Sequence, residues 1–462
     1  MQTIDDDAPR FLSKQACEAL AARITAKATG GGQTYVGTFS TWYGNLRWAR
    51  NRITTGGDVE NTTATITRTI FGAGGNAVTN ALDDATLKAT IEEAERLRLW
   101  YPQWPEMYPV AFDDKGFAEN PISSPKIWFD SSYQLTDEAR AKILEPIVAQ
   151  AAKAGLLSAG YMQVGAEGYS VVRDAFGARS LYYPMTSAQF SVTVRDPRGT
   201  GSGWAGVDFA DWNRIDPLAL FHNALDKCKR SQNPVRVEPG RYTAILEPQA
   251  VCDLFEHVMY SISREGAESG DGPFASARKG FSKIGERVFD DRITVSADPM
   301  DPDLGFVPFD WAGEPYLNTK WVENGVLKEL AYSRGYGITK LQKDQALPSN
   351  YAFRISGGTT SIDEMIATTE RGVIVTRFHN ITLLDLNSLL LTGVTRDGLW
   401  LVEHGKITKA IKNFRFTESP FFVLNNVEQL GVPQRVFHPS APSVCPPIKA
   451  RDFSFTGLMD AV

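Results

Sequence analysis

Hairpin turns between strand-like segments are the sequence feature that most constrains the fold of this chain. Three dipeptides of the kind that two-residue β-turns favour punctuate its last third: Asn324-Gly325, Asp397-Gly398 and His404-Gly405. The segments beside them are rich in Val, Leu, Ile and Trp, as strands are. We therefore expect antiparallel, β-rich structure in the C-terminal part. One helix interrupts it, because Ser361 and Glu364 have the spacing of a capping box.

The N-terminal half alternates helix and strand signals. Two strand-like segments, Thr34–Tyr43 and Leu46–Ile53, are separated by Gly44-Asn45, which predicts a hairpin turn. Helices are predicted to begin at Ser13, Thr136 and Asp216, and Asp84 is predicted to cap a fourth helix.

The whole pattern indicates an α+β fold in two domains. A chain of 462 residues is long for one domain and comfortable for two. The Pro- and Gly-marked segment Pro234–Gly240 is the expected junction. We expect an N-terminal helix and antiparallel-sheet domain at residues 1–232 and a β-rich C-terminal domain at residues 233–462.

Composition excludes several classes of function. Hydrophobic residues make up 43% of the chain and charged residues 22%, which is typical of a globular protein with a full core. The formal net charge is −6 without a basic stretch, so a nucleic-acid partner has no electrostatic support. No apolar run approaches the ~20 residues of a membrane span, and no signal peptide is recognisable. We expect a cytoplasmic protein with no membrane partner.

Cysteine and histidine are sparse. Cys17, Cys228, Cys252 and Cys445 lie far apart without a C-x-x-C pair, which argues against a disulfide framework and against a zinc ribbon. His404 occupies a turn position, and His222 and His438 are expected to be structural or solvated, the latter in a Pro-rich C-terminal loop.

Potential ligands or nucleophiles concentrate on one predicted helix, from about Pro248 to Ile262. Cys252 and Glu256 are four residues apart and can face a common point. The adjacent Glu256 and His257 point about 100° apart, and Cys252 and His257 diverge. Without a third convergent ligand, we interpret Cys252 as a small apolar packing residue.

Three ordered stretches in the C-terminal half resemble the TldD/PmbA family. They are GEPYLNTKWVENGVLKELAYSR (Gly313–Arg334), SIDEMIATTERGVIVTRF (Ser361–Phe378) and TRDGLWLVEHGKITKAIKNFRFTESPFFVLNNVEQLG (Thr395–Gly431). The stretch LRWARNRI (Leu46–Ile53), with the β-rich segment and helix after it, is similar to that family's first domain.

The resemblance implies a two-domain α+β fold and a dimer, often a heterodimer of a TldD-like and a TldE-like chain. The TldD-like chain of such a pair carries an HExxxH helix and a later Cys as zinc ligands. It cleaves peptides, in peptide maturation or degradation.

This chain departs from the family at the zinc motif. The strand RYTAIL leads into EPQAVC instead of HExxxH, so Glu247 and Cys252 stand at the positions of the two histidines and Pro248 at that of the catalytic Glu. Proline cannot act as the general base of a zinc peptidase. We expect no catalytic residue and no zinc in this chain. An altered metal site would use Glu247, Cys252 and Cys445.

The resemblance thus predicts a non-zinc, TldE-like subunit that pairs with a TldD-like zinc peptidase chain acting on peptides. Two alternatives stay open: a stand-alone homodimeric peptide-binding protein, and a peptidase with an altered Glu/Cys metal site. His257, Arg377 and His379 are the candidates for lining a substrate or partner cavity. For Arg377 and His379, a surface salt bridge is the competing explanation.

Overall fold

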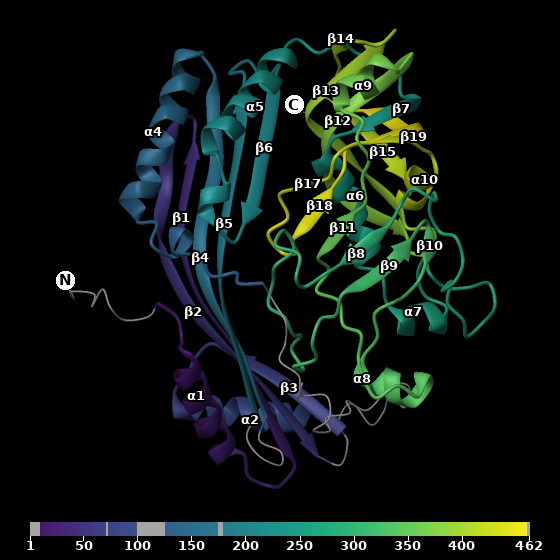
Figure 1. Ribbon diagram of the computed structural model, residues 1–462. Helices are drawn as coiled ribbons and strands as arrows, with labels where there is room; N and C mark the ends of the chain where they lie inside the picture. Colours follow the sequence, from purple (N-terminus) through teal and green to yellow (C-terminus); the bar gives the residue numbers. More distant parts are fainter. Residues whose placement is uncertain (1–9, 71–72, 99–124, 174–178, 460–462) are drawn as a thin grey trace.

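The computed structural model describes residues 10–70, 73–98, 125–173 and 179–459. These residues form an α+β structure, as predicted, and their strands make three sheets. Figure 1 shows the long strands of the first sheet on one side of the molecule and the shorter strands of the two other sheets on the other. None of the described helices has the length and apolar character that crossing a membrane requires.

The first sheet is antiparallel, with its described strands in the order β3-β2-β1-β4-β5-β6. The strands are β1 (Gln33–Ala49), β2 (Arg52–Ile70), β3 (Ala73–Thr79), β4 (Leu157–Arg173), β5 (Arg179–Arg195) and β6 (Ser202–Phe209). Alternate residues of a strand face opposite sides of a sheet. In β1, the even-numbered Val36, Trp42 and Trp48 are buried beneath helices on one side.

Four helices cover that face. Helices α1 and α2 pack at one end of the long strands, and α4 and α5 pack at the other (Figure 1). Their bounds are α1 (Lys14–Lys27), α2 (Asp84–Arg98), α4 (Asp137–Lys153) and α5 (Pro217–Arg230). The opposite face of β4 contacts the C-terminal part of the chain, where Tyr169 and Val171 pack against Val307 and Phe309.

The helix starts follow from side-chain caps. Ser13, Thr136 and Asp216 each accept a backbone N–H three residues ahead, so three predicted starts are confirmed. The fourth is one residue off: Asp83 accepts the N–H groups of Ala85 and Thr86, and α2 begins at Asp84.

The predicted turn at Gly44-Asn45 is wrong. Both residues lie inside β1, and the chain reverses at Arg50 and Asn51, whose φ angles are 50° and 60°. The reason for glycine at position 44 is the side chain of Arg140. A Cβ on residue 44 would lie 2.1 Å from Nη1 of Arg140, whose buried guanidinium packs directly against the strand there. A glycine that admits a side chain from another element looks, in sequence, like a turn glycine.

Two further sheets come from the C-terminal part. One has the order β10-β9-β8-β11-β18-β17. The other follows β12-β7-β19-β15-β13-β14, and an added β12–β13 pairing closes five of its strands into a ring. Their strands are β7 (Gly240–Leu246), β8 (Val295–Ala297), β9 (Thr319–Glu323), β10 (Val326–Leu327), β11 (Phe353–Ile355), β12 (Arg371–Asp385), β13 (Leu390–Glu403), β14 (Lys406–Ala410), β15 (Phe414–Glu418), β16 (Val427–Leu430), β17 (Gln434–Arg435), β18 (Ser443–Cys445) and β19 (Ile448–Leu458).

Short helices connect or cover these strands. They are α6 (Pro248–Met259), α7 (Arg264–Ser269), α8 (Arg334–Tyr336), α9 (Ile362–Ala367) and α10 (Pro420–Asn425). A further short helix, α3 (Asp130–Tyr133), packs on the first sheet. The predicted capping box of Ser361 and Glu364 is present at the start of α9. Helix α6 supplies much of the largest core, with Val251, Leu254 and Phe255 buried.

Two of the three predicted C-terminal turns are confirmed. Asn324-Gly325 joins β9 to β10 and His404-Gly405 joins β13 to β14, all four residues having positive φ. The third is wrong, because Asp397 and Gly398 lie within β13 at an irregularity of its pairing with β12. The two residues have φ angles of 61° and 124°. The sequence suggested a turn because a bulge and a turn both need residues that adopt positive φ.

Candidate functional site

The start of α6 holds the first of the candidate metal ligands. Strand β7 ends at Leu246, Glu247 has extended backbone angles, and Pro248 opens the helix, where its missing N–H is not needed. The Glu247 carboxylate does not cap the helix. It forms an ion pair with Lys227 of α5, at 2.5 Å.

Cys252 lies one turn further into α6 and is buried beside Cys445 of β18. A hydrogen bond with Cys445, together with burial, raises the pKa of the Cys252 thiol well above its usual value, against the opposing effect of His438. Cys252 is therefore a protonated thiol at neutral pH, and a thiol in that state is neither a good nucleophile nor a ready metal ligand.

His438 completes this cluster, which we define as Cys252, Cys445, His438 and Glu256. Its Nε2 lies 3.0 Å from a carboxylate oxygen of Glu256, and its Nδ1 lies 2.9 Å from Oγ of Ser443. Burial would lower the pKa of His438, but hydrogen bonds with Cys252 and Glu256 outweigh it and raise the pKa to about 10. The imidazole is therefore charged at neutral pH and pairs with the Glu256 carboxylate.

The expectation that His438 is merely structural or solvated missed this convergence. The predicted common point of Cys252 and Glu256 is confirmed, since both contact His438. The signal for His438 itself is absent from the sequence, because the loop that carries it is 182 positions beyond Glu256 and only the fold brings them together.

The three candidate ligands of an altered metal site do not assemble around one point. Glu247 binds Lys227, whereas Cys252 and Cys445 lie together with a protonated histidine. In the described ranges, no group of three or more His, Cys, Asp or Glu side chains is arranged to hold a metal ion. Pro248 supplies no proton acceptor. The residues present therefore do not fit a catalytic zinc.

Of the three candidate cavity residues, His257 lies on α6, whereas Arg377 and His379 lie two residues apart on β12. His257 is half-buried with Nε2 3.9 Å from Glu256, and burial lowers its pKa. The Arg377 guanidinium lies 4.4 Å from the ring centre of Trp204 in β6, with Nε 3.9 Å from the Asp397 carboxylate. His379 lines a cavity of about 240 Å³. Burial lowers the pKa of His379, and the nearby charges of Arg396 and Arg377 lower it further.

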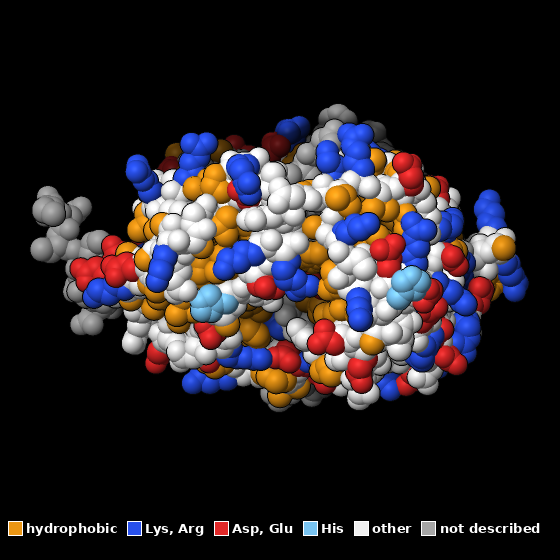
Figure 2. Space-filling model, turned by 90° about the horizontal axis from the view of Figure 1, so that it is seen from above, with side chains coloured by type: hydrophobic (Ala, Val, Ile, Leu, Met, Phe, Trp, Pro, Cys, Tyr) orange, Lys and Arg blue, Asp and Glu red, His pale blue; other side chains and the backbone are white. Residues whose placement is uncertain are grey.

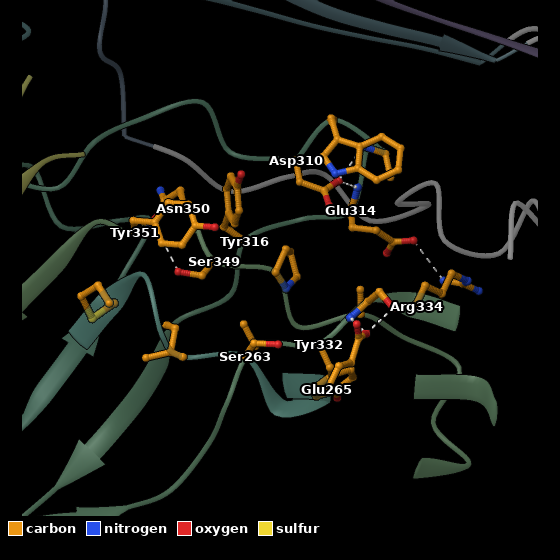
Figure 3. Close-up of a pocket in the computed structure, with 18 of the residues that line it drawn as sticks. Ser263, Glu265, Asp310, Glu314, Tyr316, Tyr332, Arg334, Ser349, Asn350 and Tyr351 are labelled. Atoms are coloured by element: carbon orange, nitrogen blue, oxygen red, sulfur yellow. Dashed lines mark hydrogen bonds and ion pairs between the residues drawn. The ribbon is translucent and has the colours of Figure 1, made fainter. Parts of the chain in front are cut away.

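A larger cavity, of about 590 Å³, lies beyond the C-terminal end of α6 (Figure 3). We call it the tyrosine cavity. Four segments far apart in the sequence form most of its wall: residues 259–265, 306–316, 331–335 and 346–351. Its volume is in the range of sites that hold small molecules or peptide side chains. The hydroxyl of Tyr260 in its wall lies 3.5 Å from a carboxylate oxygen of Glu256, so the cavity adjoins the cluster on α6.

Aromatic rings form much of the cavity wall, and three of them are exposed at its rim. Trp311 is 59% exposed, Tyr260 50% and Tyr351 43%. The Tyr260 and Tyr351 rings meet edge to face, with centroids 5.3 Å apart. Tyr316 and Tyr332 lie deeper, and Figure 3 shows Tyr316 between Tyr351 and the acidic end of the cavity.

Carboxyl groups lie beside these rings. Asp310 accepts the backbone N–H groups of Ala312 and Glu314, at 2.8 and 2.9 Å, and burial raises its pKa to about 6. Burial likewise raises the pKa of Glu314 to about 7, although Arg334 lies 3.5 Å away. Arg334 also pairs with Asp344, at 2.7 Å, so its charge is shared by two carboxylates.

The sequence contained one indirect signal for this cavity. Glu314, Tyr316, Tyr332 and Arg334 all belong to the stretch Gly313–Arg334, the first of the three that carry the family resemblance. That stretch suggested a fold and gave no reason to assign a site, because its side chains meet Tyr260, Tyr351 and Asp310 only in the folded chain.

Part of the chain is similar in sequence to known proteins. Residues 239–457 match the family described as PmbA/TldA metallopeptidase C-terminal domain. A metalloprotease from Archaeoglobus fulgidus is 28% identical over 129 residues, which cover 28% of this chain and 27% of that protein. The matched stretch thus spans about a quarter of that relative's length.

Solved structures resemble the chain over almost its whole length. A proposed modulator of DNA gyrase from Bacteroides thetaiotaomicron is 15% identical with a TM-score of 0.79, covering 96% of this chain and 99% of its own. A second, from Thermotoga maritima, is 16% identical with a TM-score of 0.77, covering 95% and 100%. TldE from Thermococcus kodakarensis is 16% identical with a TM-score of 0.75, covering 96% and 100%. At these identities the similarity establishes the fold.

Proposed function

Because this chain belongs to the TldD/PmbA family, we propose that it is the non-zinc, TldE-like subunit of a TldD/TldE-type peptidase complex that acts on peptides. The zinc of such a complex would be held by a TldD-like partner. The complex would lie in the cytoplasm; four buried free thiols are in keeping with a reducing compartment.

The observation that carries this proposal is the chemistry at the start of α6. Where a zinc peptidase needs a ligand, a general base and a second ligand, this chain has Glu247 paired with Lys227, then Pro248, then the buried Cys252 thiol. The scaffold is retained without the groups that would activate water. A chain of this kind contributes structure and substrate-binding walls to a partner's reaction.

A direct test is peptide cleavage by the purified chain. We expect the chain alone to cleave a mixed peptide substrate no faster than buffer, and a mixture with a TldD-like chain from the same source to cleave it in a chelator-sensitive way. Chelator-sensitive cleavage by the chain alone would contradict the proposal. It would support instead the alternative of a peptidase with an altered metal site, which the pairing of Glu247 with Lys227 argues against.

One observation favours the alternative of a stand-alone peptide-binding protein. The tyrosine cavity has the volume and the exposed aromatic rim of a ligand-binding site, and it lies at the opposite end of α6 from Pro248. Under that alternative the chain would form a homodimer and bind peptides without a zinc-bearing partner. The oligomeric state in the presence of a TldD-like chain separates the two.

A further inference from the structure

The tyrosine cavity is the described feature best suited to bind a ligand, and its walls combine two kinds of group. Tyrosine and tryptophan rings present π faces that attract cations, and the acidic end presents Asp310 and Glu314 (Figure 3). Exposed aromatic side chains around a hollow are typical of a binding surface, since their rings lose contact with water when a ligand covers them.

The charges of the described lining residues favour a cation. Three carboxyl groups, Glu265, Asp310 and Glu314, line the cavity against two guanidinium groups, Arg173 and Arg334. A further carboxylate, that of Asp344, pairs with Arg334. Among the described residues that line the cavity, carboxyl groups therefore outnumber guanidinium groups.

The orientation of the acids supports the same conclusion. Backbone N–H groups of Ala312 and Glu314 hold the Asp310 carboxylate in place, and Ser333 donates its N–H and Oγ–H to Glu265. The carboxyl groups are thus fixed before a ligand arrives, which lowers the entropy cost of binding. Burial raises the pKa values of Asp310 and Glu314 because ionised carboxylates lack solvation there, and a bound cation would replace that solvation.

Anionic and purely apolar ligands fit less well. An anion would meet more carboxylates than guanidinium groups. An apolar group that closed the cavity would remove water from the carboxylates of Asp310 and Glu314 without replacing its hydrogen bonds, which costs free energy.

We propose that the tyrosine cavity binds a positively charged amine of a peptide, either a lysine side chain or the amino terminus. The inference rests on the proposed function in one respect, that the ligand is a peptide. It adds a preference for a cationic group, set by this chain at the C-terminal end of α6.

Fluorescence polarisation with the full-length chain at pH 8 tests the proposal. The probes are hexapeptides of Ser, Ala and Gly with a C-terminal dye, in four forms: N-acetylated with one Lys, N-acetylated with norleucine or Glu in its place, and a free amino terminus without Lys. We expect the Lys or the free-amine peptide to bind about tenfold or more tightly than the norleucine peptide, which corresponds to one cation–carboxylate contact. Which of the two binds identifies the source of the amine.

Matched protein variants locate the effect. Glu314→Gln and Asp310→Asn should each weaken binding of the preferred peptide about tenfold and leave the norleucine peptide unaffected. Glu92→Gln removes the same charge from the exposed face of α2 and should change nothing. The peptide substitutions leave the protein untouched, so they remain decisive for a variant that folds poorly.

The outcomes separate this inference from the proposed function. Equal affinity for the lysine, free-amine and norleucine peptides, or preference for the glutamate peptide, overturns the cation site and leaves peptide binding intact. If the lysine peptide binds more tightly but neither Glu314→Gln nor Asp310→Asn weakens its binding, the amine binds elsewhere. That result also overturns the proposed cation site. If no peptide binds, the inference fails, while heterodimer formation with a TldD-like chain still reports on the proposed function by itself.

Discussion

At the scale of single residues, several buried acids are held in unusual protonation states. Glu167 of β4 is 7% exposed and accepts a hydrogen bond from the Tyr43 hydroxyl, at 2.9 Å. Burial raises its pKa to about 7, and the hydrogen bonds from Tyr43 and Ser187 only partly oppose this. The folded state therefore keeps a proton on Glu167 that the unfolded state loses near pH 4.

The raised pKa of Glu167 makes the free energy of unfolding fall as pH rises. Since the pKa of Glu167 is higher in the folded than in the unfolded chain, its contribution to stability is fully present below about pH 4 and is lost as pH rises to about 7. Glu167→Gln removes this loss. At pH 8 we expect the variant to exceed wild type in free energy of unfolding by about 2 kcal/mol, and at pH 4 to match it.

Urea unfolding of wild type and variant at both pH values measures this difference. Glu60→Gln, at an exposed position of β2, controls for the loss of a negative charge. A Glu167→Gln variant that is less stable than wild type at pH 8 would show that the folded chain stabilises the ionised Glu167 carboxylate, so that burial does not raise its pKa.

At the scale of elements, the packing of α4 against β1 depends on one glycine. The buried Arg140 of α4 pairs with Asp58 of β2, at 2.6 Å, and donates to the carbonyl of Leu135. Its guanidinium occupies the space that a Cβ on Gly44 would need. Displacing it would leave a buried charge poorly paired.

Two glycines of the same strand allow a matched comparison. Gly44→Ala should lower the free energy of unfolding by about 2–3 kcal/mol, because Arg140 must move. Gly37→Ala should change it by less than about 1 kcal/mol, because the nearest heavy atom, Cβ of Thr65, lies at an ordinary 3.8 Å from the added carbon. Equal effects of the two substitutions in urea unfolding would show that Arg140 is not held as described.

Local chemistry predicted elements well where the residues act on their own backbone. The caps at Ser13, Thr136 and Asp216 and the turns at Asn324 and His404 needed only neighbouring residues. Prediction failed at Gly44 and Gly398, where the reason for glycine is a side chain from elsewhere or a bulge. The site shows the same limit: the family stretch Gly313–Arg334 was visible, but its meeting with α6 and the loop at Tyr351 was not.

At the scale of the whole molecule, polar contacts join the first sheet to the C-terminal sheets. Asp208 of β6 forms an ion pair with Arg435 of β17, both mostly buried, and also accepts the backbone N–H of His438 at 2.6 Å. This contact links the first sheet to the loop that supplies the cluster on α6. The domain boundary after residue 232 stays a prediction.

Removing this contact should weaken the whole structure. Asp208→Ala leaves the Arg435 guanidinium buried without its carboxylate, and we expect a loss of about 3 kcal/mol in the free energy of unfolding. Asp208→Asn keeps an acceptor and should cost less. Asp226→Ala, which breaks an exposed pair with Arg230 on α5, should cost less than about 1 kcal/mol. If Asp208→Ala were as mild as Asp226→Ala in urea unfolding, the ion pair would not be holding the sheets together.

The central claim is that this chain completes a peptidase whose zinc belongs to a partner. Native mass spectrometry of the purified chain, alone and mixed with a TldD-like protein from the same source, tests it most directly. The account predicts a metal-free chain that shifts to a one-to-one heterodimer carrying a single zinc. A homodimer that holds its own zinc and does not bind the TldD-like protein would contradict it.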